Sequence, residues 1–389
     1  MNTRLFFLDS LKVALICLVV AHHAGQPYGG SDGFWYFQSH QEAINLGTFF
    51  SINSAFFMSL FFFISAYFVP SSFDKKGPAL FIKERLKRLG LPLLLGFFIL
   101  IPVLMYAFYI NFRGYESISF YNYYTNIYLG LGVQPEGWTG PSWPDLQFAH
   151  LWFIEHLLVY AVLYSVIRLL WKKRPLERLV KQLPSTGAVV LFGVLVALAT
   201  FAIRILHPID EWTGFLGFIQ TEFAHVPQYA AFFIAGILAY RNNWLHSLSH
   251  AVGITWLAVG VALMVFRYAG WVPFLSKGGF NGASLGYSFY ETFLCLGLSI
   301  GLLYAFRELG NRTNWMTSML ARNAFTVYVL HVPIVVCLQY VLENTELSTM
   351  TKFLVVATGG IVLSFFVSHG INQITRRFGT KTKQNDLPS

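Results

Sequence analysis

Apolar residues gather along the chain in about ten runs of roughly twenty residues, and polar segments separate these runs. A helical run of ~20 apolar residues spans the hydrocarbon core of a bilayer. The pattern therefore predicts an all-α fold, a polytopic membrane helix bundle with about ten transmembrane helices. The expected spans are 5–25, 48–69, 90–110, 151–170, 187–206, 226–240, 252–268, 288–306, 323–342 and 353–374. The sixth is the shortest, and a miscount of one span would invert the sidedness of every later one.

Composition and charge agree with a membrane protein. Of the 389 residues, 55% are hydrophobic and only 12% are charged, which leaves too little polar surface for a soluble protein of this size. The net charge of +9 comes from basic residues beside the apolar runs, where they attract anionic headgroups, so no nucleic-acid partner is expected. With the N-terminus inside, 21 of the 27 lysines and arginines lie in inner segments and 5 in outer ones. This excess predicts a multi-pass protein of the cell (inner or plasma) membrane with both termini in the cytoplasm.

The first span carries ionisable side chains, each of which costs about 2.5–3.5 kcal/mol in hydrocarbon. At ~100° per residue, Asp9, Lys12 and His23 share one stripe of the helix, with His23 about 16 Å beyond Lys12 along the axis. His22 points about 80° away from that stripe. One interpretation is an Asp9–Lys12 ion pair that stabilises the bundle, with solvated histidines at the interface. The other is that the side chains on this stripe serve the protein's function. The charges, and the lack of a convincing small-x-small site before Gly25, indicate a retained helix rather than a cleaved signal peptide.

An inner loop rich in basic residues, 71–92, is expected before the third span. Arg85 and Arg88 are three residues apart, close enough on a helical turn to bind one anion together, and Lys83 lies beside them. Guanidinium groups match phosphate oxygens in a bidentate way. The segment is either a positive-inside anchor or a binding site for the phosphates of a nucleotide-like cytoplasmic donor.

Further polar groups lie inside or beside the spans. His150, Glu155 and His156 open the fourth span, while Glu291 and His331 lie within later spans and should face the bundle interior. A metal site built from these histidines lacks HExxH or comparable spacing, so none is expected. Three cysteines lie inside apolar spans, without zinc or disulfide spacing: Cys17, Cys295 and Cys337.

The expected outer segments are rich in aromatic residues. They either form an interfacial belt or supply flat surfaces for stacking on a sugar ring. These residues are Phe34, Trp35, Tyr36, Phe37, Tyr121, Tyr123, Tyr124, Trp138 and Trp143.

Five segments carry a resemblance to a known family: FLDSLK followed by HH, then FFFISAYF, RLKRLGLP, HLWF and FTVYVLH. Their order and intervals are similar to those of the membrane-bound acyltransferase 3 family, and the resemblance covers almost the whole chain. The chain resembles the short members, which lack an appended extracytoplasmic domain. We therefore expect an acyltransferase 3-like transmembrane domain over residues 1–375 and a short basic cytoplasmic tail over 376–389.

The resemblance implies roles for particular residues. The family's arginine-ten-residues-histidine motif falls on Lys12 and His23, and the histidine is the expected catalytic base. The family's RxxR motif, which contacts acyl-CoA, falls on Arg85 and Arg88. Two positions depart from the family pattern: Lys12 keeps the charge of the usual arginine without its planar fork, and Ala66 stands where the family often has glycine.

The implied function is O-acyl transfer across the membrane. Acetyl-CoA or succinyl-CoA would dock from the cytoplasm, pass its pantetheine arm along Lys12, and present the thioester near His23. His23 would act as general base on a hydroxyl of an extracytoplasmic carbohydrate or other acceptor. Lys12 or Asp9 would orient this arrangement or stabilise the oxyanion. The expected acceptor contacts are His22, His150, Trp152, Glu155 and His331, and no metal cofactor is expected.

Two other classes remain open. A transporter or flippase of a glycan or lipid-linked intermediate also needs ionisable groups along its path, but the internal repeat common in such proteins is not found in this sequence. An inactive relative acting as a membrane sensor or scaffold is the third class. The sequence fixes neither the acyl group, nor the acceptor, nor the oligomeric state.

Overall fold

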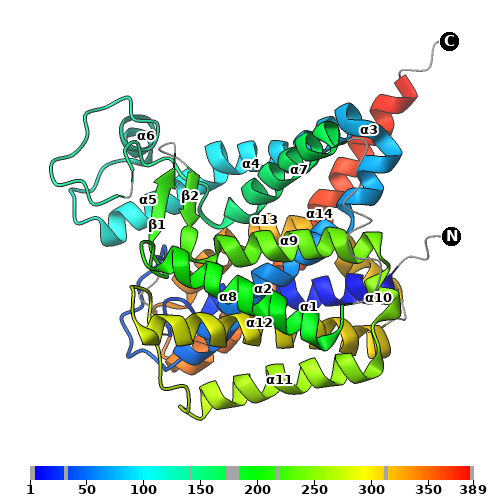
Figure 1. Ribbon diagram of the computed structural model, residues 1–389. Helices are drawn as coiled ribbons and strands as arrows, with labels where there is room; N and C mark the ends of the chain where they lie inside the picture. The colour runs from blue at the N-terminus through cyan, green and yellow to red at the C-terminus, as the bar shows by residue number, and fades with distance from the viewer. Residues whose placement is uncertain are drawn as a thin grey trace. The chain divides into compact units, whose positions relative to one another are not determined.

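The computed structural model describes residues 5–29, 34–140, 142–171, 184–215, 219–310 and 314–385. Ten helices in this part of the chain are long and apolar enough to cross a membrane, which confirms the predicted helix bundle (Figure 1). The sidedness of the termini stays a prediction. Some of the basic residues behind it, Arg4, Arg312 and those at 172–183, lie outside the described residues.

The chain divides into two units. Residues 1–47 and 309–389 form the first, called here the terminal unit, and residues 48–308 form the second, the central unit. Each is described by itself.

Three helices in mutual contact build the terminal unit: α1 (Phe6–Gly25), α13 (Trp315–Leu342) and α14 (Thr349–Asn385). The side chain of Gln339 bonds to the carbonyl of Ala24, so the end of α1 lies beside the second half of α13 and the two helices run in parallel. Asn323 bonds to His369, so α14 runs antiparallel to α13. The helix α14 continues through the first ten residues of the expected tail, to Asn385.

Residues 34–46, which follow α1, are hydrogen-bonded to the end of α13 and to the turn between α13 and α14. The ring of His40 lies 2.7 Å from a carboxylate oxygen of Glu343, and Thr349 donates a 2.9 Å hydrogen bond to the carbonyl of Glu42. The hydroxyl of Tyr340 donates to the carbonyl of Tyr36. These bonds fix the position of residues 34–46 in the terminal unit.

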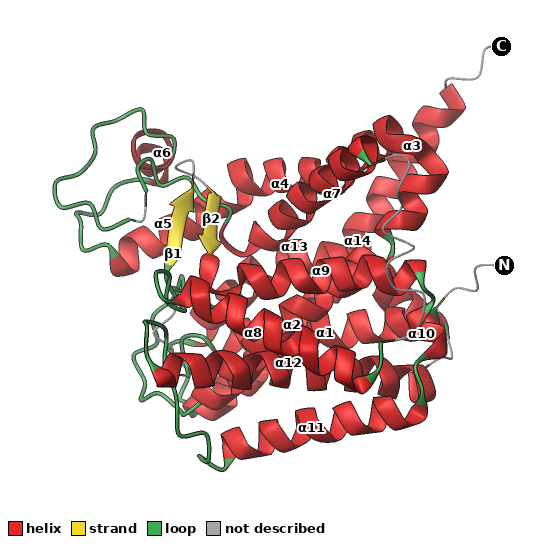
Figure 2. Ribbon diagram, in the orientation of Figure 1, coloured by secondary structure: helices red, strands yellow, loops and turns green. Residues whose placement is uncertain are grey.

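The central unit contains the remaining helices and a two-stranded antiparallel hairpin, drawn as arrows in Figure 2. In chain order its elements are α2 (Gly47–Tyr67), α3 (Val69–Arg85), η1 (Leu86–Gly90), α4 (Leu91–Leu95), η2 (Gly96–Leu100), α5 (Ile101–Phe112), α6 (Phe120–Asn122), η3 (Tyr123–Tyr128), η4 (Ala149–Leu151), α7 (Trp152–Leu170), α8 (Thr186–Arg204), β1 (Trp212–Phe215), β2 (Ile219–Glu222), η6 (Phe223–His225), α9 (Val226–Arg241), α10 (Trp244–Ser247), α11 (His250–Tyr268) and α12 (Gly282–Gly310). In the hairpin, Trp212 pairs with Glu222.

The expected basic loop before the third span is helical, so that expectation is wrong. A helical run, interrupted once, extends over Val69–Phe112. Its irregularities are a kink at Gly77, whose φ of 71° suits a residue without a Cβ, and two π-helical turns, η1 and η2. The backbone at Gly77 is not helical, so two helical segments meet at this kink, and Pro78 stands at the start of the second.

Close contacts and an ion-pair cluster hold the helices of the central unit together. A Cβ added to Gly260 of α11 would lie 2.6 Å from the backbone of Leu298 in α12, so the two backbones touch through small residues. Near the start of α3, Asp74 accepts hydrogen bonds from Arg168 of α7 and Arg241 of α9. One carboxylate therefore joins three helices.

The aromatic segment between α5 and α7 folds around a buried ion pair. Arg113 and Asp145 are 3.0 Å apart with side chains 4% and 1% exposed, and Tyr123 donates a 2.8 Å hydrogen bond to the same carboxylate. The guanidinium also lies 4.4 Å from the ring centre of Trp138. Tyr123 is thus a buried structural residue, which belongs neither to an interfacial belt nor to a sugar-stacking surface, whereas Tyr121 is exposed.

Candidate functional site

Three histidines gather in the terminal unit at the end of α1. The ring of His23 lies 5.2 Å from that of His331 and 5.5 Å from that of His22, measured between centroids. His22 and His331 are buried, and His23 is half-buried. With the indole of Trp35 these residues are called the histidine cluster below. Of the predicted site residues, the fold brings these three together.

The tautomer of His331 follows from its backbone contact. Its Nδ1 lies 2.8 Å from the carbonyl oxygen of Tyr328, three residues earlier in α13. A carbonyl can only accept, so the neutral ring carries its proton on Nδ1 and Nε2 is the basic nitrogen. His331 has no exposed surface, and it therefore presents a fixed ring beside His23.

Trp35 stacks on His23 and is itself held in place. The two rings lie 5.3 Å apart at an angle of only 13°. The indole Nε1–H donates a 2.8 Å hydrogen bond to Oε1 of Gln339, whose Nε2 donates to the carbonyl of Ala24 at 3.2 Å. Sequence reasoning missed Gln339, and it noted Trp35 only as one aromatic residue among many. A buried glutamine within an apolar span is the signal that points to such a bond.

Asp9 and Lys12 lie at the other end of α1. They form the predicted ion pair at 2.8 Å, and their side chains are 18% and 28% exposed. Because eleven residues separate Lys12 from His23, the helical rise places the two about 16 Å apart along the axis. The fold therefore keeps this pair away from the histidine cluster.

The basic motif lies where α3 passes into η1 in the central unit. Arg85 is half-buried with its guanidinium 5.0 Å from the ring centre of Phe81, whereas Lys83 and Arg88 are exposed. Neither arginine forms an ion pair with an acid among the described residues. The motif continues into a π-helical turn rather than the α-helical turn expected from its spacing. Local π-helix often accompanies functional positions.

The residues that open the fourth span form a compact polar and aromatic group in the central unit. Nδ1 of His156 lies 2.6 Å from Glu155 and 2.9 Å from the carbonyl of Trp152, and that indole stacks on Tyr229 at 5.4 Å. His150 is buried in the 3₁₀ turn before α7. Within the described ranges, no group of three histidine, cysteine or acidic residues is arranged to hold a metal ion.

A buried charge network in the central unit was not predicted. Glu291 of α12, expected to face the interior, binds Arg204 of α8 and lies 3.0 Å from Nε2 of His225. Nδ1 of His225 lies 2.8 Å from Glu222. Two carboxylates around one imidazole favour the protonated ring, which balances the four charges. Burial alone would raise the pKa of Glu222, but His225 and the Asp210 amide lower it below its ordinary value.

Sequence reasoning identified only Glu291 of this network, because Arg204 lies at the end of an apolar run and was counted as an outer cation. Its side chain is 1% exposed. An arginine within the expected span 187–206 is a signal for a buried partner.

The ten apolar helices and the polar clusters at their ends define an integral membrane protein, and a comparison with known families gives its class. The model of a family described as an acyltransferase domain matches residues 5–369, and the chain belongs to this acyltransferase 3 family.

Two relatives share a name. The chain is similar to the glucans biosynthesis protein C of Escherichia coli (strain SMS-3-5 / SECEC), 27% identical over 255 residues, 63% of this chain and 60% of that protein. It is also similar to the protein of that name from Salmonella paratyphi B (strain ATCC BAA-1250 / SPB7), 28% identical over 249 residues, 61% and 58% of the two chains. The matched region thus spans about three fifths of each relative.

Proposed function

We propose that the protein is an integral membrane O-acyltransferase, which moves an acetyl or succinyl group from cytoplasmic acyl-CoA to a hydroxyl of an extracytoplasmic carbohydrate. The observation that carries the proposal is the histidine cluster of the terminal unit in a chain of the acyltransferase 3 family. An imidazole titrates near neutral pH, as a general base for an alcohol requires.

His23 is the base in this proposal, and its neighbours position it. His23 removes the proton from the acceptor hydroxyl, whose oxygen then attacks the thioester carbon and releases the CoA thiolate, which takes up a proton. Trp35 fixes the plane of the His23 ring, and His331 lies beside it with Nε2 as its basic nitrogen. This arrangement supports base catalysis because a fixed ring loses little freedom in the transition state.

The donor contacts are proposed from the basic motif. Arg85 and Arg88 bind phosphates of acyl-CoA, with Lys83 as an additional cation, and the absence of ion pairs for both arginines among the described residues supports this role. Lys12, held by Asp9 at 2.8 Å, contacts the donor's polar arm. Its distance of about 16 Å from His23 along α1 argues against an oxyanion role at that ring.

The acceptor contacts are proposed for residues that combine polar and aromatic character. The name of the two relatives favours a glucan or a related carbohydrate. Sugars are bound by rings that stack and by side chains that exchange hydrogen bonds, and both kinds occur here. The proposed contacts are His22, His150, Trp152, Glu155 and His331.

The direct test is release of free CoA by the purified protein from labelled acetyl-CoA or succinyl-CoA, in the presence of a glucan acceptor. His23→Ala should abolish CoA release and O-acylation without lowering the yield of folded protein. His246→Ala is the matched control because His246 is an exposed histidine outside the proposed site. Undiminished acyl transfer by His23→Ala would refute the role of the base. No CoA release by the unaltered protein, together with movement of a glycan across vesicles, would favour a transporter.

A further inference from the structure

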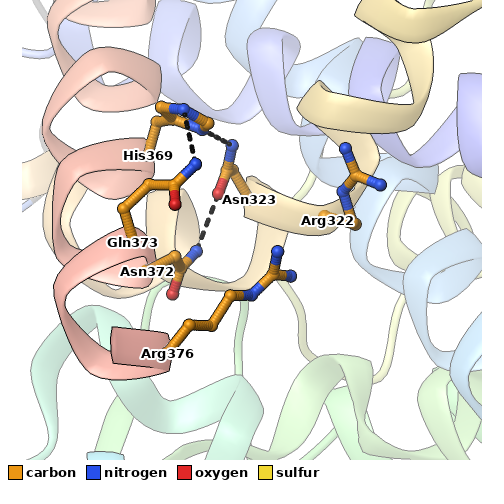
Figure 3. A pocket seen from close by; sticks show the side chains of 6 residues that line it. All are labelled: Arg322, Asn323, His369, Asn372, Gln373 and Arg376. Atoms are coloured by element: carbon orange, nitrogen blue, oxygen red, sulfur yellow. Dashed lines mark hydrogen bonds between the residues drawn. The ribbon is translucent and has the colours of Figure 1, made fainter. Parts of the chain in front are cut away.

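A small polar pocket lies between α13 and α14 in the terminal unit, near the end where α13 begins. Its volume is about 40 Å³. Figure 3 shows the arginine side chains reaching it from two different helices, with the amides and the imidazole forming one wall. The lining residues are Arg322, Asn323, His369, Asn372, Gln373 and Arg376.

Hydrogen bonds fix the amide wall. Asn372 donates through Nδ2 to Oδ1 of Asn323 at 2.7 Å, and Thr326 donates to Oδ1 of Asn372 at 3.1 Å. Asn323 in turn donates through Nδ2 to the carbonyl of Met319 at 3.0 Å. Both asparagine oxygens therefore already accept a hydrogen bond within the wall.

The wall also contacts both ring nitrogens of His369. Nδ2 of Asn323 lies 3.3 Å from Nδ1 of the imidazole, and this amide is oriented by its bond to the carbonyl of Met319. On the other side of the ring, Nε2 lies 3.3 Å from Nε2 of the exposed Gln373, so each ring nitrogen faces an amide nitrogen, which can only donate.

The charge of the lining has one sign. None of the six lining residues is acidic, and two are arginines. Arg322 forms no ion pair with any acid among the described residues. Two guanidinium groups and amide N–H groups make the lining rich in donors, while each asparagine oxygen already accepts a hydrogen bond within the wall. Such a lining is complementary to an anion with several acceptor oxygens.

We propose that this pocket binds a phosphate group. A single water molecule needs roughly 10–15 Å³, so the pocket has room for phosphate oxygens but not for a whole nucleotide or sugar. The rest of the ligand would extend from the open side.

Two kinds of ligand contain such a phosphate group, and the position of the pocket fits both. An anionic lipid headgroup is one, because Arg322 and Arg376 are exposed side chains of membrane helices. The other is the nucleotide part of the donor, which rests on the proposed function. Asn323 precedes His331 by eight residues, or about 12 Å along α13, so the pocket and the histidine cluster lie at separate depths of one helix.

The test measures binding of two probes to the full-length protein in nanodiscs. One probe is 3′-phosphoadenosine 5′-diphosphate, titrated calorimetrically in phosphatidylcholine nanodiscs. The other is phosphatidylglycerol, counted by native mass spectrometry after partial delipidation. Arg322→Gln and Arg376→Gln should each weaken binding of one probe about tenfold or more, since each removes hydrogen bonds to a charged group. Arg377→Gln is the matched control, because this exposed neighbour does not line the pocket.

The outcomes separate the two sources and the two proposals. Loss of nucleotide affinity identifies the donor as the source, and loss of phosphatidylglycerol retention identifies the lipid. Binding of both probes by Arg322→Gln and Arg376→Gln as tightly as by Arg377→Gln would overturn the proposal, and so would an unaltered protein that binds neither probe. Because the readout is binding without acceptor, a protein that transfers no acyl group still gives a clear answer.

Discussion

The bond between Gln339 and Trp35 offers the sharpest test of how the histidine cluster is held. Replacing Gln339 with Met keeps the volume of this fully buried side chain but removes its donor and its acceptor. The indole N–H of Trp35 and the carbonyl of Ala24 then lose bonds of 2.8 and 3.2 Å. Both groups lie in residues that are at most 6% exposed, so water cannot replace the lost partners freely.

The expected cost follows from these two orphaned groups. A buried polar group without a partner costs about 1–3 kcal/mol, so the variant should lose roughly 2–6 kcal/mol of stability. The indole, no longer held at its N–H, should tilt away from the ring of His23. A misplacement of ~1 Å near the reacting atoms can cost up to about a hundredfold in rate, so kcat should fall about tenfold or more while KM for acyl-CoA stays constant.

Two assays check this expectation. Thermal unfolding of the detergent-solubilised protein should show a Tm several degrees lower for Gln339→Met, and CoA release should show the fall in kcat. Gln41→Met is the matched control, because Gln41 donates an exposed hydrogen bond to the carbonyl of Leu347 and should change Tm and kcat little. A Gln339→Met protein with the Tm and kcat of the control would refute the positioning role of the Trp35 stack.

Three further predictions concern the central unit. Arg85→Gln and Arg88→Gln should each raise KM for acyl-CoA about tenfold, because each removes a charge-assisted bond to phosphate, while kcat stays nearly constant. CoA release measures both constants, and an unchanged KM would contradict the donor site. Glu291→Ala should lower the free energy of unfolding by about 3–5 kcal/mol, because it leaves the charge of Arg204 buried without its partner. Thermal or denaturant unfolding measures this loss, and a loss below about 1 kcal/mol would contradict the buried charge network. Burial raises the pKa of Asp145 to about 6, so the folded state holds this proton more tightly than the unfolded state. The stability that this proton contributes is fully present below the unfolded-state pKa of ~3.9. It is lost as the pH rises through 6. Asp145→Asn should remove this part of the pH dependence of Tm.

The sequence predicted the membrane helices because apolar runs of sufficient length leave few alternatives in a bilayer. It offered the Asp9–Lys12 pair as one of two interpretations, because a separation of three residues in one helix brings the two side chains together. It failed on the segment before the third span, where Gly77, Pro78 and several charges resemble a loop. A helix at an interface tolerates such residues, since its polar side can face water.

The histidine cluster was predictable only in part. The stripe on α1 identified His23, and the cost of a buried imidazole identified His331 as an interior residue. Their contact depends on how α1 and α13 pack, which no local pattern specifies. Trp35 and Gln339 are 304 residues apart, and a bond over such a separation leaves no periodic trace in the sequence.

The terminal unit places its polar groups at two levels, and the helix directions determine which groups share a level. The helices α1 and α13 run in parallel, and His23 lies beside His331. Lys12 precedes His23 by about 16 Å of helical rise and Arg322 precedes His331 by about 13 Å, so both cations lie at nearly the same depth. One level therefore carries the histidine cluster and the other carries Lys12 and Arg322. A ligand with a phosphate at one end and a reactive carbon at the other matches this separation, which links the phosphate pocket to the base without requiring any side chain to serve both.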